Sequence, residues 1–268
     1  MSLRDASFET LELEWQGPVL RVWLNRPEKL NALNRTALEE IEEVFGALQG
    51  DFETRVVVLG GRGRAFCAGA DRGDPPGLPS ADAGARERRY ASQLGLRASR
   101  AIEEVEAVTI ARVQGHAVGG GCVLAAACDF RVATKGARFH VPEVDLGIPL
   151  TWGATPRLIN ELGAARAREL ILLCEEIDGT RAFAWGLVHR VVPEAELDVE
   201  VDALVEKLLA KPEAAVHATK TQFRAYALRG RLGDVTETDG DVLVGALREA
   251  AARAAFPRPR KGGAKQRE

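Results

Sequence analysis

The feature that most constrains the fold is a glycine-rich stretch at residues 114–129, with the sequence QGHAVGGGCVLAAACD. The β-branched run VTIARV precedes it and an Ala/Leu-rich run continues it, which predicts a buried strand that leads into a buried helix. The first N–H groups of a helix have no intrahelical partner and the helix dipole adds positive potential, so an anion or a developing oxyanion is stabilised there. The alternative is that the glycines only permit close packing of strand on helix.

Length and composition exclude several classes of protein. The 268 residues are enough to bury a sizeable core, and 46% hydrophobic with 28% charged residues is ordinary for a globular chain. The net charge of −3 gives no reason to expect nucleic acid as a partner. The longest uncharged run, residues 113–128, falls short of the roughly 20 apolar residues of a spanning helix, so we expect no membrane partner. The N-terminus carries no apolar signal segment, which predicts a cytoplasmic location.

The cysteines and histidines do not have the spacing of a metal site. The four cysteines form no CxxC pair and no ligand pattern with the four histidines. We therefore expect no metal, and we expect the cysteines to be small buried apolar residues.

Strand and helix patterns alternate in the first two thirds of the chain, which predicts an α/β core. Periodicity predicts a β-hairpin at residues 8–15 and 19–24, a helix capped by Asn34 at 38–48 and a buried strand at 55–59. A long helix at residues 86–105 and two further strands at 129–134 and 187–192 are also predicted. Residues 71–84 are rich in Gly, Pro and Asp and predict a long loop, which is either a functional lid or disordered.

The last third of the chain has a different sequence pattern, which predicts three amphipathic helices in succession without strands between them. They are predicted at residues 197–209, 213–228 and 242–256. Such a helical appendage often serves assembly, so we expect a homo-oligomer. The chain thus divides into a core at residues 1–196, a helical oligomerisation region at 197–256, and a basic tail at 257–268 that we expect to be disordered.

Four motifs occur in a characteristic order: LNRPEKLNAL at residues 24–33, AFCAGAD at 65–71, GHAVGGG at 115–121 and PEVDLG at 142–147. Together they resemble the crotonase (enoyl-CoA hydratase/isomerase) superfamily, from about residue 11 to residue 256. The resemblance implies a spiral of repeated ββα units with a C-terminal helical trimerisation region. It also implies an acyl-CoA thioester as substrate, no cofactor besides the CoA of that substrate, and a homotrimer or a dimer of trimers.

The resemblance also implies which residues form the site. The backbone N–H groups of Ala70 and Gly120 would form an oxyanion hole for the thioester carbonyl, and one such donor is worth roughly 3–4 kcal/mol of barrier. The implied substrate-binding residues are Lys29, Leu30, Arg64, Ala68, Asp71, Val123 and Trp152. Lys29, Arg64 and also Arg72 are cations that suit the phosphates of CoA, with an ordinary surface charge as the alternative for each.

One position departs from the pattern of the hydratases, which hold a water between two glutamates. Val123 stands at the first of these positions, and only the second, Glu143, remains. The structural alternative for Glu143, next to Pro142, is an acidic residue in the first turn of a helix. A single carboxylate can move a proton from one carbon to another, so we expect double-bond isomerisation or related enolate chemistry with Glu143 as the acid and base.

Two other functions stay open on the sequence: an enoyl-CoA hydratase that uses Glu143 alone, and a non-catalytic acyl-CoA-binding protein of the same fold. RNA binding through the basic tail is a third class, which the net acidity disfavours. Near Glu143, His140 and Asp145 are candidate helpers, and Trp152 either narrows the acyl pocket or packs in the core. Thr151 stands where some subgroups carry an aspartate, which argues against dienoyl-CoA isomerase or dehalogenase chemistry.

Overall fold

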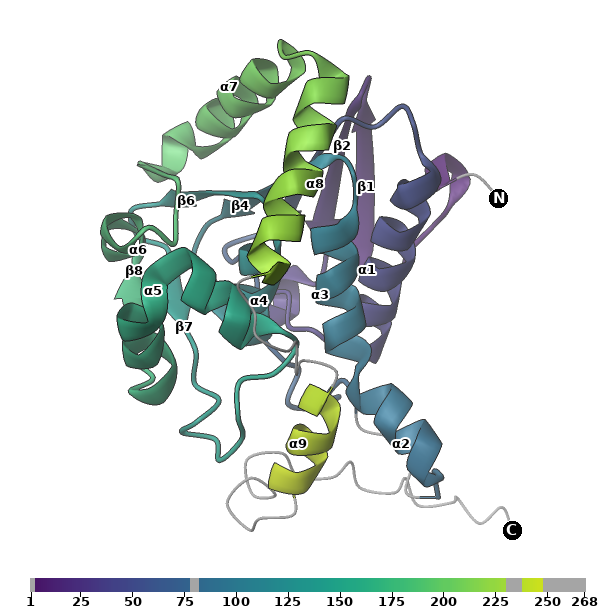
Figure 1. The fold of residues 1–268 in the computed structure, drawn as a ribbon, viewed down its shortest axis with the longest axis vertical. Coiled ribbons are helices and arrows are strands. Elements are labelled where there is room, and N and C mark those ends of the chain that lie inside the picture. The colour runs from purple at the N-terminus through teal and green to yellow at the C-terminus, as the bar shows by residue number, and fades with distance from the viewer. Residues whose placement is uncertain (1–2, 78–81, 230–237, 248–268) are drawn as a thin grey trace.

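The computed structural model describes residues 3–77, 82–229 and 238–247 (Figure 1). A six-stranded sheet forms its centre, in the order β1 (Leu11–Gln16), β2 (Val19–Leu24), β3 (Val56–Gly61), β4 (Val108–Val113), β6 (Phe130–Thr134) and β9 (Arg190–Val192). The β1–β2 hairpin is antiparallel and the other neighbours pair in parallel. A second sheet has the order β5 (His116–Val118), β7 (Arg138–His140) and β8 (Ile177–Asp178).

Helices connect and cover the strands. They are α1 (Arg35–Ala47), α2 (Ala85–Ser92), α3 (Leu94–Glu104), α4 (Gly120–Ala127), α5 (Ala154–Leu172), α6 (Gly179–Trp185), α7 (Leu197–Leu209), α8 (Glu213–Arg229) and α9 (Asp239–Ala246). Short 3₁₀ turns occur at Leu3–Asp5, Pro27–Lys29, Leu48–Gly50 and Glu194–Glu196. Within the described ranges, every helix is too short or too polar to cross a membrane.

Strand β3 shows how the core is arranged. All six of its residues are buried, and successive side chains of a strand point to opposite faces. Val57 and Leu59 join the larger apolar cluster with α1, α3 and α4, whereas Val56 and Val58 join a smaller cluster that α7 covers. Both faces of the sheet are therefore covered at β3, as the continuous apolar sequence of this strand predicts.

The long periodic segments confirm the sequence-based predictions. The hairpin, strands β3, β4 and β6 and helices α1, α7 and α8 lie close to their predicted ranges, whereas the strand predicted at residues 187–192 forms only at Arg190–Val192, as β9. The Asn34 side chain caps α1 by accepting a hydrogen bond from the Ala37 N–H at 3.0 Å. The four cysteines are free and buried, also as predicted.

Other predictions need correction. The single helix predicted at residues 86–105 is two helices, α2 and α3, which are separated at Gln93. Strands β5, β7 and β8 were not predicted, because two or three residues are too few to show an alternation. The helix predicted at 242–256 begins earlier, as α9 at Asp239, and its end and the basic tail at 257–268 lie outside the described residues.

Candidate active site

Two glycine-containing turns lie side by side, each after a strand of the central sheet. Residues 65–71 follow β3, and residues 115–121 follow β4. A parallel bridge joins Cys67 to Ala117: the Cys67 N–H donates to the His116 carbonyl at 2.8 Å, and the Val118 N–H donates to the Cys67 carbonyl at 3.0 Å. The fold thus brings together two motifs that are separated by some fifty residues in the sequence.

Each turn presents one backbone N–H group without a partner among the described residues. Leu33 pairs in parallel with Ala70, so that the Leu33 N–H donates to the Gly69 carbonyl and the Asp71 N–H donates to the Leu33 carbonyl. This pairing uses the amide groups on both sides of Ala70 and leaves the Ala70 N–H unbonded. Gly120 is the first residue of α4, so its N–H has no intrahelical acceptor.

Glycine is required in these turns by close packing as well as by conformation. Gly69 has φ +87°, and a Cβ there would lie 2.8 Å from the Val118 carbonyl oxygen. A Cβ on Gly121 would lie 2.5 Å from the Cys67 carbonyl oxygen. Close packing therefore accounts for the glycines, and the start of α4 at Gly120 leaves an N–H group without an intrahelical acceptor.

Buried polar side chains hold the turn at residues 65–71. The Asn31 amide donates to the Arg62 and Ala65 carbonyls, both at 2.9 Å, and its oxygen accepts from the Arg26 N–H. Arg26 forms an ion pair with Asp71 at 2.8 Å. Burial acts to raise the pKa of Asp71, but the hydrogen bonds from Arg26 and from the Gly73 N–H outweigh it, and the pKa lies below its ordinary value.

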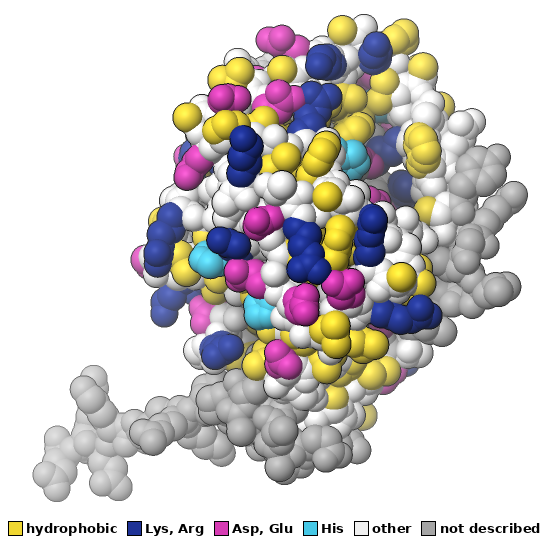
Figure 2. Space-filling model, turned by 90° about the vertical axis from the view of Figure 1, so that its left-hand side faces the viewer, with side chains coloured by type: hydrophobic (Ala, Val, Ile, Leu, Met, Phe, Trp, Pro, Cys, Tyr) yellow, Lys and Arg dark blue, Asp and Glu magenta, His cyan; other side chains and the backbone are white. Residues whose placement is uncertain are grey.

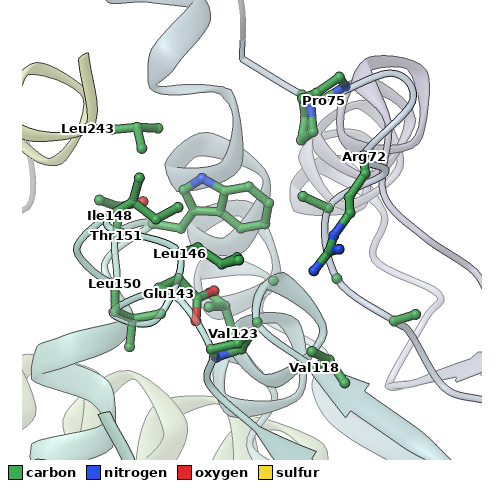
Figure 3. A pocket seen from close by; sticks show the side chains of 18 of the residues that line it. Arg72, Pro75, Val118, Val123, Glu143, Leu146, Ile148, Leu150, Thr151 and Leu243 are labelled. Carbon is green, nitrogen blue, oxygen red and sulfur yellow. The ribbon is translucent and has the colours of Figure 1, made fainter. Parts of the chain in front are cut away.

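The two turns open into a cavity of about 130 Å³, which Figure 3 shows. Its walls are mostly apolar side chains and bare backbone, with Arg72, Glu143 and Thr151 as the polar side chains. The lining consists of Ala68, Gly69, Ala70, Arg72, Pro75, Pro76, Val118, Gly119, Gly120, Val123, Pro142, Glu143, Leu146, Ile148, Leu150, Thr151, Trp152, Leu243 and Leu247. Among the described residues no cluster of His, Cys, Asp and Glu is suited to a metal ion.

Glu143 lies against the turn that begins α4. A Cβ on Gly119, which has φ +49°, would lie 2.6 Å from Glu143 Oε1, so only glycine leaves room for the carboxylate. Glu143 Oε2 is buried and has no hydrogen-bond partner in the described part of the chain. Burial raises the pKa of Glu143 to about 7. A carboxyl group with this pKa is suited to accept and return protons near neutral pH.

Of the described residues that line the cavity, Glu143 is the one that carries a carboxylate. Val123, which is 2% exposed, lines the same end of the cavity (Figure 3). Asp145 is exposed and His140 is half-buried, and neither side chain lines the cavity. The two candidate helpers of Glu143 therefore do not share the cavity with it.

The predicted substrate-binding residues divide into three groups. Ala68, Val123 and Trp152 line the cavity with Ala70, Gly120 and Glu143. Leu30 is adjacent, because its carbonyl accepts from the Ala68 N–H at 2.9 Å. Lys29 and Arg64 are exposed and lie outside the cavity lining, and Asp71 is paired with Arg26 rather than presented to the cavity.

Several residues that line the cavity were not predicted from the sequence. They come from three segments: Pro75 and Pro76; Leu146, Ile148 and Leu150; and Leu243 and Leu247. The Pro-rich loop at 71–84 carried a signal, since it was predicted as a lid or a disordered segment. For Leu243 and Leu247 there was no signal, because only the packing of α9 beside α2 brings them to the cavity (Figure 1).

Comparison with known proteins gives consistent matches along the chain. The family model for enoyl-CoA hydratase/isomerase matches residues 14–255. A crotonyl-CoA hydratase of Syntrophomonas wolfei is 37% identical over 80% of this chain and 81% of its own length. A mitochondrial Δ(3,5)-Δ(2,4)-dienoyl-CoA isomerase of Homo sapiens is 34% identical over 82% of this chain and 70% of its own length.

The fold has a match among solved structures. The crystal structure of an enoyl-CoA hydratase from Mycobacterium avium subsp. paratuberculosis aligns with a TM-score of 0.82 and 29% identity, over 93% of this chain and 95% of that one.

Proposed function

Because the chain belongs to the enoyl-CoA hydratase/isomerase (crotonase) family of enzymes and has the crotonase fold, we propose that it forms an enolate from an acyl-CoA thioester. In this proposal the described cavity holds the acyl group, two backbone N–H groups bind the thioester oxygen, and one carboxylate transfers the proton. No cofactor is needed besides the CoA of the substrate.

The oxyanion hole consists of the N–H groups of Ala70 and Gly120. Removal of a proton beside a thioester puts negative charge on the carbonyl oxygen, and donors that are already fixed in place stabilise that charge without reorganisation. Both amides are unbonded in the described structure, and both residues line the cavity. The N-terminus of α4 adds its dipole to the Gly120 donor.

Glu143 is the acid and base. Its carboxylate takes a proton from C2 of a 3-enoyl thioester, and the electrons of that C–H bond form a C1–C2 double bond while the carbonyl electrons move onto the thioester oxygen, which gives a dienolate conjugated with the C3–C4 double bond. The protonated acid then returns the proton to C4, which gives the 2-enoyl thioester and restores the carboxylate. Hydration would need a water to be held as well as deprotonated, and Val123 offers no group that holds it.

The CoA moiety lies outside the cavity, along the exposed cations Lys29 and Arg64. Gly63 approaches Pro27, since a Cβ on Gly63 would lie 3.0 Å from Pro27 Cβ, so the two segments that carry these cations are neighbours. Arg72 lines the cavity with no ion pair among the described residues, and its guanidinium points inward (Figure 3). It is available to an anionic group of the bound thioester.

The single observation that carries this function is the buried, unpaired Oε2 atom of Glu143 in the same cavity as two unbonded N–H groups. The experiment is exchange of the C2 protons of butyryl-CoA in D₂O, followed by mass spectrometry. A saturated thioester has no double bond to hydrate, so uptake of deuterium reports enolate formation alone. We expect exchange with the unmutated protein and none with Glu143→Gln.

Two alternatives remain, and a second substrate separates them. An enoyl-CoA hydratase that uses Glu143 alone would convert crotonyl-CoA to a product heavier by one water, which the names of the similar hydratases favour. A non-catalytic acyl-CoA-binding protein would bind butyryl-CoA without exchanging its protons and without converting any enoyl-CoA.

A further inference from the structure

Trp152 has an unusual backbone conformation that its surroundings fix. Its φ of +59° lies in the left-handed region, which non-glycine residues seldom adopt. The Trp152 carbonyl accepts hydrogen bonds from Ser99 Oγ at 2.8 Å and from Arg157 Nη1 at 2.9 Å. Arg157 is itself held by an ion pair with Glu103, with Nη2 and Oε2 2.6 Å apart.

The indole of Trp152 fits into a notch that two glycines leave between α3 and α4. A Cβ on Gly95 would lie 2.0 Å from the ring atom Cε2, and a Cβ on Gly120 would lie 2.5 Å from Cζ3. Neither position accommodates a larger residue while the ring stays in place. The benzo edge of the indole therefore lies directly against the residue whose N–H we assign to the thioester carbonyl.

This placement leaves little length for the acyl group. Glu143 lies against Gly119 and the indole against Gly120, so both border the acyl chain within a few atoms of the carbonyl. The cavity of about 130 Å³ is close to the roughly 150 Å³ that holds a molecule the size of benzene, and well below the about 300–1,000 Å³ of drug-sized pockets. Leu243 of α9 and Leu146 also line it (Figure 3).

We propose that Trp152 is a specificity-determining residue that limits the acyl group to about four to six carbon atoms, the size that such a cavity holds. The inference rests on the proposed function, because it takes the thioester carbonyl to be bound at Gly120. A longer chain has to push the indole out of its notch, against the hydrogen bonds that fix the Trp152 backbone.

The test is the dependence of acyl-CoA binding on chain length, measured by titration calorimetry with the saturated thioesters from butyryl-CoA to decanoyl-CoA. In an open apolar channel each buried methylene improves affinity about fourfold. We expect the affinity of the unmutated protein to rise up to six carbons and to fall at least tenfold at eight. Glycine tolerates the φ of +59° at position 152, so the Trp152→Gly variant should keep the backbone conformation. The affinity of this variant for acyl-CoA should continue to rise with the length of the acyl chain.

Two further variants control for a general loss of packing. Trp185→Ala removes another half-buried tryptophan, which lies in α6 outside the cavity lining, and should leave the chain-length profile unchanged. Gly95→Ala puts a methyl group into the notch and should weaken butyryl-CoA binding at least tenfold. In the Trp152→Gly background the same Gly95→Ala change should have no effect, because the indole is absent.

The outcomes distinguish a failure of the proposed role of Trp152 from a failure of the proposed acyl-CoA function. If octanoyl-CoA binds the unmutated protein more tightly than hexanoyl-CoA, or if Trp152→Gly keeps the cutoff, Trp152 does not set the length. If every variant retains its thermal unfolding midpoint and none binds an acyl-CoA of any length, the proposed function itself is wrong, and the inference falls with it.

Discussion

At the residue scale, the proposed chemistry depends on one carboxylate that burial keeps ready to exchange protons. Glu143 Oε2 is buried without a partner in the described structure, and the raised pKa of about 7 follows from that burial. Val123 sets the second condition of the proposal, because its apolar side chain lines the cavity and offers no group that could hold a water. The position of both residues in known motifs was readable from the sequence, whereas the burial of Oε2 was not.

Glu143→Gln keeps the shape of the side chain and removes its ability to carry a proton. We expect turnover to fall by a factor of about 10² or more, with the dissociation constant of butyryl-CoA changed less than threefold. Steady-state kinetics and calorimetry measure the two effects separately. Unchanged turnover would show that Glu143 is only a carboxylate at the edge of a pocket.

The pH dependence of catalysis should report the same group. Because the base must be ionised to take the first proton, kcat/KM should rise with pH through about 7 and then level off. The residual activity of Glu143→Gln should lack this rise. A profile that is flat from pH 5 to 9 in the unmutated protein would contradict the assignment.

The raised pKa of Glu143 also predicts that the free energy of unfolding falls as the pH rises, which is opposite to the trend expected for kcat/KM. The folded protein holds the Glu143 proton up to pH 7, whereas an unfolded chain releases it near 4.5, so folding is favoured below this window and that advantage is lost as the pH rises through it. His189, whose pKa burial lowers to about 4, acts in the other direction. Its contribution is the same in Glu143→Gln, so the difference in unfolding free energy between the two proteins isolates Glu143.

At the scale of elements, the N-terminus of α4 fixes the geometry of the site. Gly119→Ala forces a φ of +49° on a residue with a side chain and puts its Cβ 2.6 Å from Glu143 Oε1. A carboxylate displaced by about 1 Å can lose about 10² in rate, so we expect a loss of that size. Gly46→Ala is the matched control: outside its own helix and chain neighbours, no atom of the described residues lies within 4 Å of the added Cβ, so its activity should stay unchanged. Equal activities of the two variants would contradict the account.

The elements also show where sequence-based prediction succeeds and where it ends. The strands and helices with many periodic residues, such as β1, β2, β3 and α1, form as predicted. The three strands of the small sheet are fixed by tertiary pairing with one another rather than by their own pattern. The site divides in the same way: the motif residues were predicted, whereas Leu243 reaches the cavity only because α9 packs beside α2.

At the scale of the whole molecule, large apolar side chains remain exposed on helices α5, α6, α7 and α8. Leu172, Phe183, Val199 and Phe223 are 49–74% exposed in the described structure. Figure 2 shows the face that carries α5 and α6, where apolar side chains lie scattered between charged ones. Apolar side chains that lie singly between charged ones are ordinary for a protein surface, so the expectation of a homotrimer or a dimer of trimers rests on the family resemblance.

Sedimentation velocity at micromolar concentration tests the assembly. We expect a species of three or six times the chain mass of 28.9 kDa. A single species with the mass of one chain would contradict the prediction, and a dimer would point to a different interface.

The most direct test of the single-carboxylate mechanism compares two reactions of the unmutated protein in one buffer. These are the isomerisation of a six-carbon 3-enoyl-CoA and the hydration of crotonyl-CoA, each measured as kcat/KM with the product identified by mass spectrometry. With Glu143 present and Val123 in place of a second carboxylate, we predict that isomerisation exceeds hydration by at least about tenfold. Hydration that equals or exceeds isomerisation would contradict the account, because another group would then have to hold the water.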